Sequence, residues 1–124
     1  MSTRANIIIN DYDSNSSVIL YSHCDGYPEG VGKNLCDIIY NYENTHLKCK
    51  SFGIFLDIIR SNDFHYEITD DIHGDIEFLY IVNLYPTENY NQVFCYKALQ
   101  LWEDNYYKDW WKDEKYLKNN EIEL

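Results

Sequence analysis

Basic residues are scarce in this sequence. It contains 10 Lys and Arg against 21 Asp and Glu, which gives a formal net charge of -11. Proteins that bind nucleic acids or anionic membranes need cationic side chains to neutralise phosphates. This composition therefore argues against both kinds of partner and favours a protein partner with a basic surface. The alternative is that the charge only keeps the protein in solution.

Several other features are missing. The four cysteines form no CxxC pair: they stand at Cys24, Cys36, Cys49 and Cys95. No apolar run approaches the roughly 20 residues of a membrane span, and the first residues lack the apolar segment of a signal peptide. We therefore expect a cytosolic protein whose cysteines are reduced and mostly buried.

The apolar pattern predicts one α+β domain over residues 1–124. Hydrophobic residues make up 45% of the chain, enough for a core. Strands are expected where β-branched and aromatic residues are dense or alternate with polar ones, and helices where apolar residues recur at intervals of three and four. The expected strands are 5–10, 18–22, 64–69, 76–85 and 92–98, and the expected helices are 31–42, 51–60 and 103–118.

This order, ββααβββα, implies a mostly antiparallel sheet with the two central helices on one face. We expect the first two strands to form a hairpin and the last three to form an antiparallel meander, because short turns join them. Residues 103–118 are predicted to form an amphipathic helix, and residues 119–124 a frayed tail.

The stretch Tyr21–Gly32 is glycine-rich and joins a strand to a helix. It is not a P-loop, because Tyr27 stands where the first glycine belongs and Asn34 replaces the magnesium-binding hydroxyl. Cys24 is a poor nucleophile candidate, because neighbours on an extended chain point in opposite directions and His23 cannot activate it. We expect a stiff structural turn.

Two His-x-Asp pairs suggest a metal site. One pair is His23 with Asp25, and the other is His73 with Asp75, followed by Glu77. Residues two apart in a strand share a face, so both pairs could converge on one zinc, iron or manganese ion. Such a site would suit a metal-dependent hydrolase or a ligand-binding protein. The alternative is a structural clasp, in which these side chains bond to nearby turns.

Acidic residues dominate the middle of the chain. Between Arg60 and Lys97 there is no Lys or Arg. Alternate residues of a strand lie about 6.6–6.8 Å apart, which is comparable with the spacing of phosphates along nucleic acid, so an acidic sheet edge could imitate a phosphate backbone toward a basic groove. The alternative is a solvated acidic face. The carboxylates are Asp63, Glu67, Asp70, Asp71, Asp75, Glu77 and Glu88.

Large aromatic residues cluster near the C-terminus, at Trp102, Tyr106, Tyr107, Trp110 and Trp111. Trp and Tyr are enriched at binding hot spots, so this cluster could anchor a partner. Alternatively, the predicted helix closes over the open face of the sheet, or it mediates a homodimer.

Two motifs carry a resemblance to a known group. They are Tyr21-Ser-His-Cys-Asp-Gly-Tyr-Pro28 and His73-Gly-Asp-Ile-Glu-Phe-Leu-Tyr80. Together they resemble small phage and prophage proteins that carry Tyr-x-His-x-Asp-Gly-Tyr-Pro and, later, Gly-Asp-Ile-Glu-Tyr-x-Tyr. The resemblance implies a setting, a mobile element whose small acidic proteins often inhibit host systems that handle nucleic acids. It implies no particular activity.

These features together predict a binding protein that is not an enzyme and needs no cofactor. It would inhibit a host nucleic-acid-handling or defence protein, such as a CRISPR effector, by occupying its basic surface. The acidic stretch would steer the encounter, and the aromatic cluster would anchor it. A toxin-neutralising immunity protein is a further alternative with the same logic.

Overall fold

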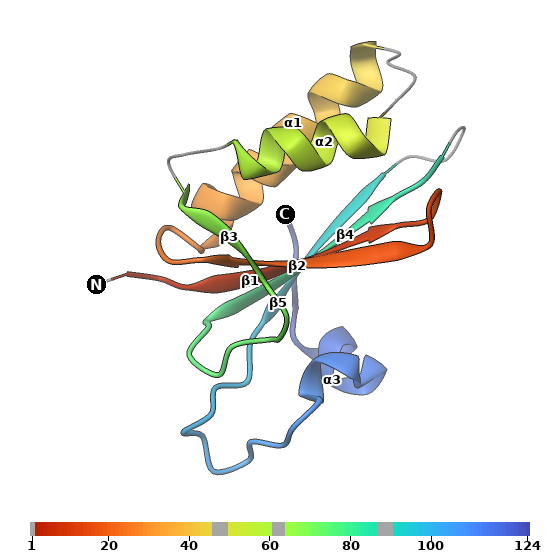
Figure 1. Ribbon diagram of the computed structural model, residues 1–124. Helices are drawn as coiled ribbons and strands as arrows, with labels where there is room; N and C mark the ends of the chain where they lie inside the picture. Colours follow the sequence, from red (N-terminus) through yellow and green to blue (C-terminus); the bar gives the residue numbers. More distant parts are fainter. Residues whose placement is uncertain (1, 46–49, 61–63, 87–90) are drawn as a thin grey trace.

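The fold is a single sheet with helices on both faces (Figure 1). The computed structural model describes residues 2–45, 50–60, 64–86 and 91–124. Its strands are β1 (Ala5–Asp11), β2 (Ser16–Ser22), β3 (Tyr66–Thr69), β4 (Phe78–Leu84), β5 (Gln92–Lys97) and β6 (Glu121–Ile122). The strand order is β3-β2-β1-β4-β5-β6, and only β1 and β4 pair in parallel. The predicted α+β class and mostly antiparallel sheet are confirmed.

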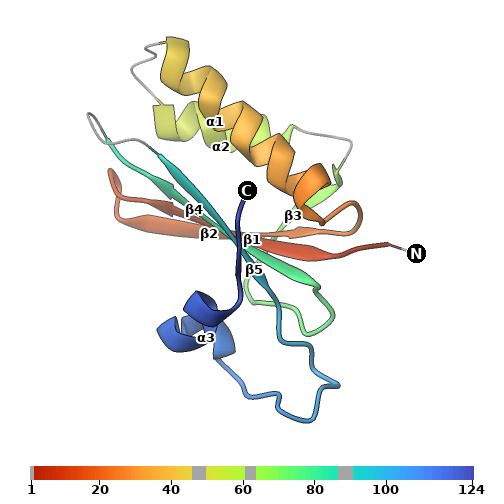
Figure 2. The same cartoon turned by 180° about the vertical axis from the view of Figure 1, so that it is seen from behind.

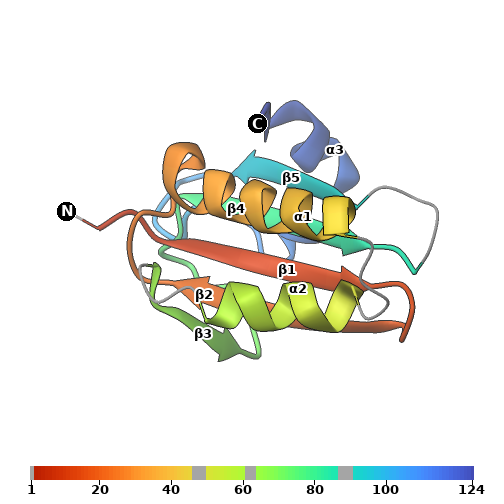
Figure 3. The ribbon, with the colours of Figure 1, turned by 90° about the horizontal axis from the view of Figure 1, so that it is seen from above.

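The predicted hairpin of β1 and β2 is confirmed, whereas the predicted meander is confirmed for the antiparallel pair β4 and β5 and is wrong for β3. β3 pairs with β2 at the edge of the sheet, and β4 lies beside β1 in the centre. Both central strands are apolar on both faces, as the run Ile7, Ile8, Ile9 illustrates, and only a central position buries such a strand fully. The connection between β3 and β4 therefore crosses from the edge to the centre (Figure 3).

One face of the sheet is covered by α1 (Lys33–Thr45) and α2 (Lys50–Ile59) (Figures 1 and 3). Leu35 and Ile39 of α1 and Ile58 of α2 are buried in one apolar cluster with strand residues such as Ile7 and Val82. The predicted central helices are thus confirmed on one face.

The turn before α1 is tightly packed. It includes a single helical turn, η1 (Pro28–Gly32). A Cβ on Gly30 would collide with the carbonyl oxygen of Asp25, which accepts a hydrogen bond from the N–H of Val31. The Tyr80 hydroxyl donates to the carbonyl of Gly26 at 2.7 Å, so β4 holds the turn in place.

The second face, opposite α1 and α2, is partly covered by the C-terminal segment (Figure 2). The predicted helix 103–118 is wrong. A helical turn, η3 (Trp110–Lys112), is followed by the short helix α3 (Glu114–Asn119). Asp109 has a left-handed backbone (φ 64°), which interrupts a helix, and the Asp113 carboxylate caps α3 by accepting from the N–H groups of Lys115 and Tyr116.

The end of the chain is ordered by pairing. β6 pairs with β5 through Cys95 and Ile122 and through Tyr96 and Glu121. The Asn120 carbonyl also accepts from the N–H of Lys97 at 2.9 Å. The expectation of a frayed tail over 119–124 is therefore corrected, because Asn119 ends α3 and Glu121 and Ile122 form the edge strand β6.

Candidate functional site

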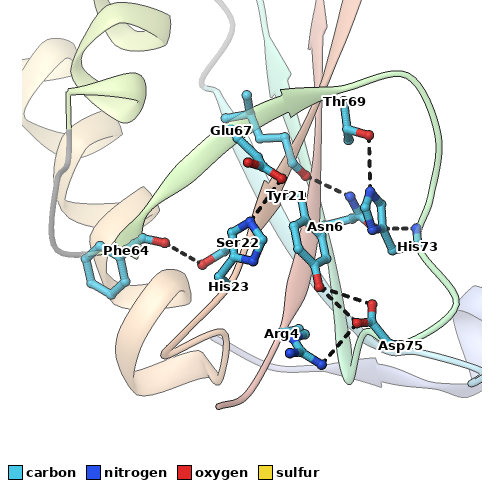
Figure 4. Close-up of polar contacts among 11 residues, drawn as sticks. Arg4, Asn6, Tyr21, Ser22, His23, Phe64, Glu67, Thr69, His73 and Asp75 are labelled. Carbon is cyan, nitrogen blue, oxygen red and sulfur yellow. Dashed lines mark hydrogen bonds and ion pairs between the residues drawn. The ribbon is translucent and has the colours of Figure 1, made fainter.

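The two His-x-Asp pairs do not form one metal site. His23, His73 and Asp75 gather around Tyr21, but Asp25 does not join them (Figure 4). The Tyr21 ring stacks on His73 with 3.9 Å between ring centroids and meets His23 edge-on at 4.5 Å. The ring thus lies against both imidazoles. Within residues 2–45, 50–60, 64–86 and 91–124, no three His, Cys, Asp or Glu side chains are placed to share an ion.

Both histidines have other partners. His23 Nε2 lies 2.9 Å from Glu67 Oε1, and His73 Nε2 lies 3.1 Å from Thr69 Oγ1. The backbone N–H of His73 donates to Asn6 Oδ1 at 2.8 Å. Asn6 is fully buried in β1, so this bond fixes the loop after β3 to the centre of the sheet.

The carboxylates are engaged as well. The Tyr21 hydroxyl donates to Asp75 at 3.0 Å, and Arg4 Nη1 lies 3.1 Å from the same carboxylate (Figure 4). Burial, followed by this hydrogen bond, raises the pKa of Tyr21 to about 12. Asp25 instead accepts from the Tyr27 hydroxyl at 3.2 Å. We call Arg4, Tyr21, His73 and Asp75 the Tyr21 clasp, because they tie the loop 70–77 to β1 and β2. The sequence had not indicated Arg4 or the central position of Tyr21.

The acidic stretch is a loop surface more than a strand edge. Asp63 and Glu88 lie outside the described residues. Asp70, Asp71 and Glu77 are exposed and lie between β3 and β4, whereas Asp75 is paired with Arg4. Glu67 alone belongs to a strand. The regular strand spacing expected for an imitation of phosphates is therefore absent from these described carboxylates, although their concentration on one loop remains.

The predicted aromatic anchor divides into surface and core. Trp102 is 66% exposed, whereas Trp110 is 2% exposed and packs edge-on against Tyr116 with 5.2 Å between ring centroids. Tyr106 and Trp111 are half-buried. The exposed Tyr107 donates its hydroxyl to Asp113 at 2.7 Å, a bond that raises the pKa of Tyr107 to about 12 and lowers the pKa of Asp113.

The acidic loop, residues 70–77, and the aromatic segment, residues 101–111, are joined directly. The N–H of Leu101 donates to the carbonyl of Gly74 at 3.0 Å, and a Cβ on Gly74 would lie only 3.0 Å from the Cβ of Leu101. This close approach requires glycine or a shift of the neighbouring chain. It brings Leu101, which is 62% exposed, to the same hollow that Asp71 lines, and Trp102 follows Leu101 in the chain. Leu101 was not predicted from the sequence, since its role depends on this long-range contact.

A hollow of about 290 Å³ lies where the two segments meet. Its walls combine apolar and aromatic side chains with two carboxylates and one lysine. We call it the acidic–aromatic groove, and its lining is Asp71, Ile72, Leu101, Tyr106, Lys108, Asp109, Trp110 and Trp111.

The chain's own lysine illustrates the chemistry of this groove. Lys112 Nζ lies 4.8 Å from the centroid of the Trp111 ring and 3.8 Å from Asp109 Oδ1. A cation is attracted both to the face of an indole and to a carboxylate. In this structure Lys112 itself occupies that position, and Lys108 also lines the groove.

Comparisons with known proteins give no relative: no family model, curated protein or solved structure matches this chain. Across the part of the chain that the structure describes, no helix combines the length and the apolar character that crossing a bilayer requires.

Proposed function

We propose that this protein is a phage- or prophage-type inhibitor that binds a basic surface of a host nucleic-acid-handling or defence protein, such as a CRISPR effector. One observation carries the proposal. The acidic loop 70–77 is joined to Leu101, the residue before the exposed Trp102, through the hydrogen bond between Leu101 and Gly74.

The arrangement supports both parts of a binding reaction. With a net charge of -11, the chain attracts a basic partner over distance, and the exposed carboxylates direct that partner to the groove. Trp102 and Leu101 then supply exposed apolar area, and burying this area against the partner stabilises the complex. The Tyr21 clasp contributes indirectly, because it holds the acidic loop in one conformation before binding. We place this encounter in the host cytosol.

The test is capture from a host lysate followed by mass spectrometry. The variant Asp70→Asn/Asp71→Asn/Glu77→Gln removes three exposed charges and leaves Asp75 in the clasp. The control Asp13→Asn/Glu29→Gln/Glu123→Gln removes three exposed charges elsewhere. We expect wild type and control to capture the same basic protein and the loop variant to lose it.

The outcomes separate the alternatives. Loss of the partner in both variants would show that overall charge, and not the groove, governs binding, whereas full capture by the loop variant would remove the loop from the binding surface. Capture of a nuclease toxin encoded beside this chain would favour an immunity protein over an inhibitor of host defence. A partner whose affinity is the same at low and high salt would exclude electrostatic steering.

A further inference from the structure

The second face of the sheet carries rows of uncharged side chains near the hairpin that joins β1 to β2. Figures 1 and 3 place α3 on this face, on the β5 side of the sheet and across from β3. Two transverse rows cross the four central strands near that hairpin. One row is apolar, and the other consists of amides and a hydroxyl. We call them together the neutral face: Ile19, Ile8, Ile81 and Phe94, then Ser17, Asn10, Asn83 and Gln92.

The polar row is bonded to itself. Ser17 Oγ donates to Asn10 Oδ1 at 2.8 Å, and Asn10 Nδ2 donates to Asn83 Oδ1 at 3.0 Å. Asn83 Nδ2 donates to Gln92 Oε1 at 3.3 Å, and that oxygen also accepts from the Tyr85 hydroxyl at 3.2 Å. The row is therefore ordered before any contact, and covering it costs less than covering isolated amides.

The apolar row is only partly covered. Ile8 is buried, whereas Ile19, Ile81 and Phe94 remain half-buried. The C-terminal segment covers part of this row as well, because Ile8 belongs to the apolar cluster of Trp110, and Ile19, Ile81 and Phe94 pack against that cluster. Burial of the remaining apolar area by another molecule would be favourable.

Charge identifies the occupant. The chain carries 10 basic and 21 acidic residues, yet none of the eight side chains of the neutral face is charged. Two copies at -11 repel each other, so they can meet closely only where carboxylates are missing. A basic partner has no reason to prefer this face. Amides both donate and accept, so a row of them is complementary to its own copy across a two-fold axis.

We propose that the neutral face is the interface of a homodimer, in which the sheets of two copies pack face to face with the Asn10–Asn83 pair near the two-fold axis. Sheets stacked in this way lie about 10 Å apart, so the contact is limited to the part of the face that the C-terminal segment leaves open. This surface differs from the C-terminal helix that the sequence suggested for self-association, and the proposal is independent of the proposed function.

The test is the mass of the full-length protein in solution, measured by sedimentation equilibrium from about 1 to about 300 μM. Asn83→Asp keeps the acceptor for Asn10 and places two like charges near the axis. We expect it to weaken dimerisation about tenfold or more, since like charges opposed in an interface are strongly unfavourable. Asn105→Asp, an exposed position outside the face, changes the net charge equally and should dimerise as wild type does.

Gln92→Glu is a second variant whose side chain is exposed, so its folding is not in question. It should also weaken the dimer. A wild-type protein that stays monomeric over the whole range would overturn the proposal. Dimerisation of Asn83→Asp and Gln92→Glu equal to that of wild type would do the same, because it would place the contact on another surface.

Discussion

The acidic–aromatic groove and the neutral face differ in charge and in how they are built. The acidic–aromatic groove consists of loop residues held by long-range contacts, with exposed carboxylates beside exposed Leu101 and Trp102. The neutral face consists of strand residues in register, with no charged side chain. Under the two proposals above, the groove serves a basic partner and the neutral face serves a second copy of the chain.

The strongest test of how the groove is built is Trp110→Ala. Trp110 is 2% exposed and forms the floor of the groove within the second apolar cluster. Removing a buried tryptophan should lower the free energy of unfolding by about 3–5 kcal/mol. Urea unfolding measures this, with Trp102→Ala as the control, which should cost less than about 0.5 kcal/mol because Trp102 is exposed. A smaller loss for Trp110→Ala than for Trp102→Ala would contradict the division between core and surface.

Affinity for the partner should depend on the exposed Trp102, which matters little for stability. Trp102→Ala should weaken the affinity for the captured partner by about 2 kcal/mol, or roughly 30-fold, as is typical of an exposed aromatic anchor. Isothermal titration calorimetry with that partner measures the change. Tyr40→Ala is the matched control, because Tyr40 is also 66% exposed but belongs to α1 on the other side of the sheet. An equal loss in both variants would remove Trp102 from the binding surface.

The two tryptophans also show why the sequence predicted some of this molecule and not the rest. Residues Trp102, Tyr106 and Trp110 recur every four positions, which favours a helix. The left-handed Asp109 and the Asp113 cap override that periodicity locally. Apolar periodicity did predict β1, β2, α1 and α2 correctly, since each buries one regular stripe or run.

The candidate site was harder to predict for a related reason. Both β3 and β4 were located correctly, but the expected pairing between them was wrong. The position of a strand in the sheet depends on how much of its apolar surface must be buried, and β4 needs the central position beside β1. Once β4 lies beside β1, Gly74 of the loop 70–77 contacts Leu101 of the aromatic segment. Contacts between such distant residues leave no local pattern in the sequence, and His23 and His73 likewise gave no sign that Tyr21 lies against both of them.

The clasp that supports the groove should have a moderate effect on stability. Tyr21→Phe keeps the stacking on His73 but removes the hydroxyl that donates to Asp75, so it should cost about 1 kcal/mol at neutral pH. The pKa of Tyr21 is raised from 10.0 to about 12, which means that the folded state favours the protonated phenol. Its contribution is complete below pH 10 and is lost as the pH rises through about 12.

The difference in stability between wild type and Tyr21→Phe should therefore shrink at alkaline pH. Urea unfolding at about pH 8 and about pH 11 measures it. Tyr27→Phe is the control, because Tyr27 is exposed and bonds only to Asp25 next to it among the contacts described for its hydroxyl. A constant difference between the two pH values would mean that the hydroxyl of Tyr21 does not stabilise the fold through Asp75.

The smallest expected effect is also the one that separates the two surfaces most directly. Screening weakens attraction between the acidic loop and a basic partner, but it also weakens repulsion between two copies at -11. Raising the salt concentration from about 50 to about 500 mM should therefore lower the affinity for the partner and modestly strengthen the dimer. Titration calorimetry and sedimentation of one preparation measure both. A dimer that weakens with salt alongside partner binding would mean that charged groups hold the copies together, which the neutral face does not contain.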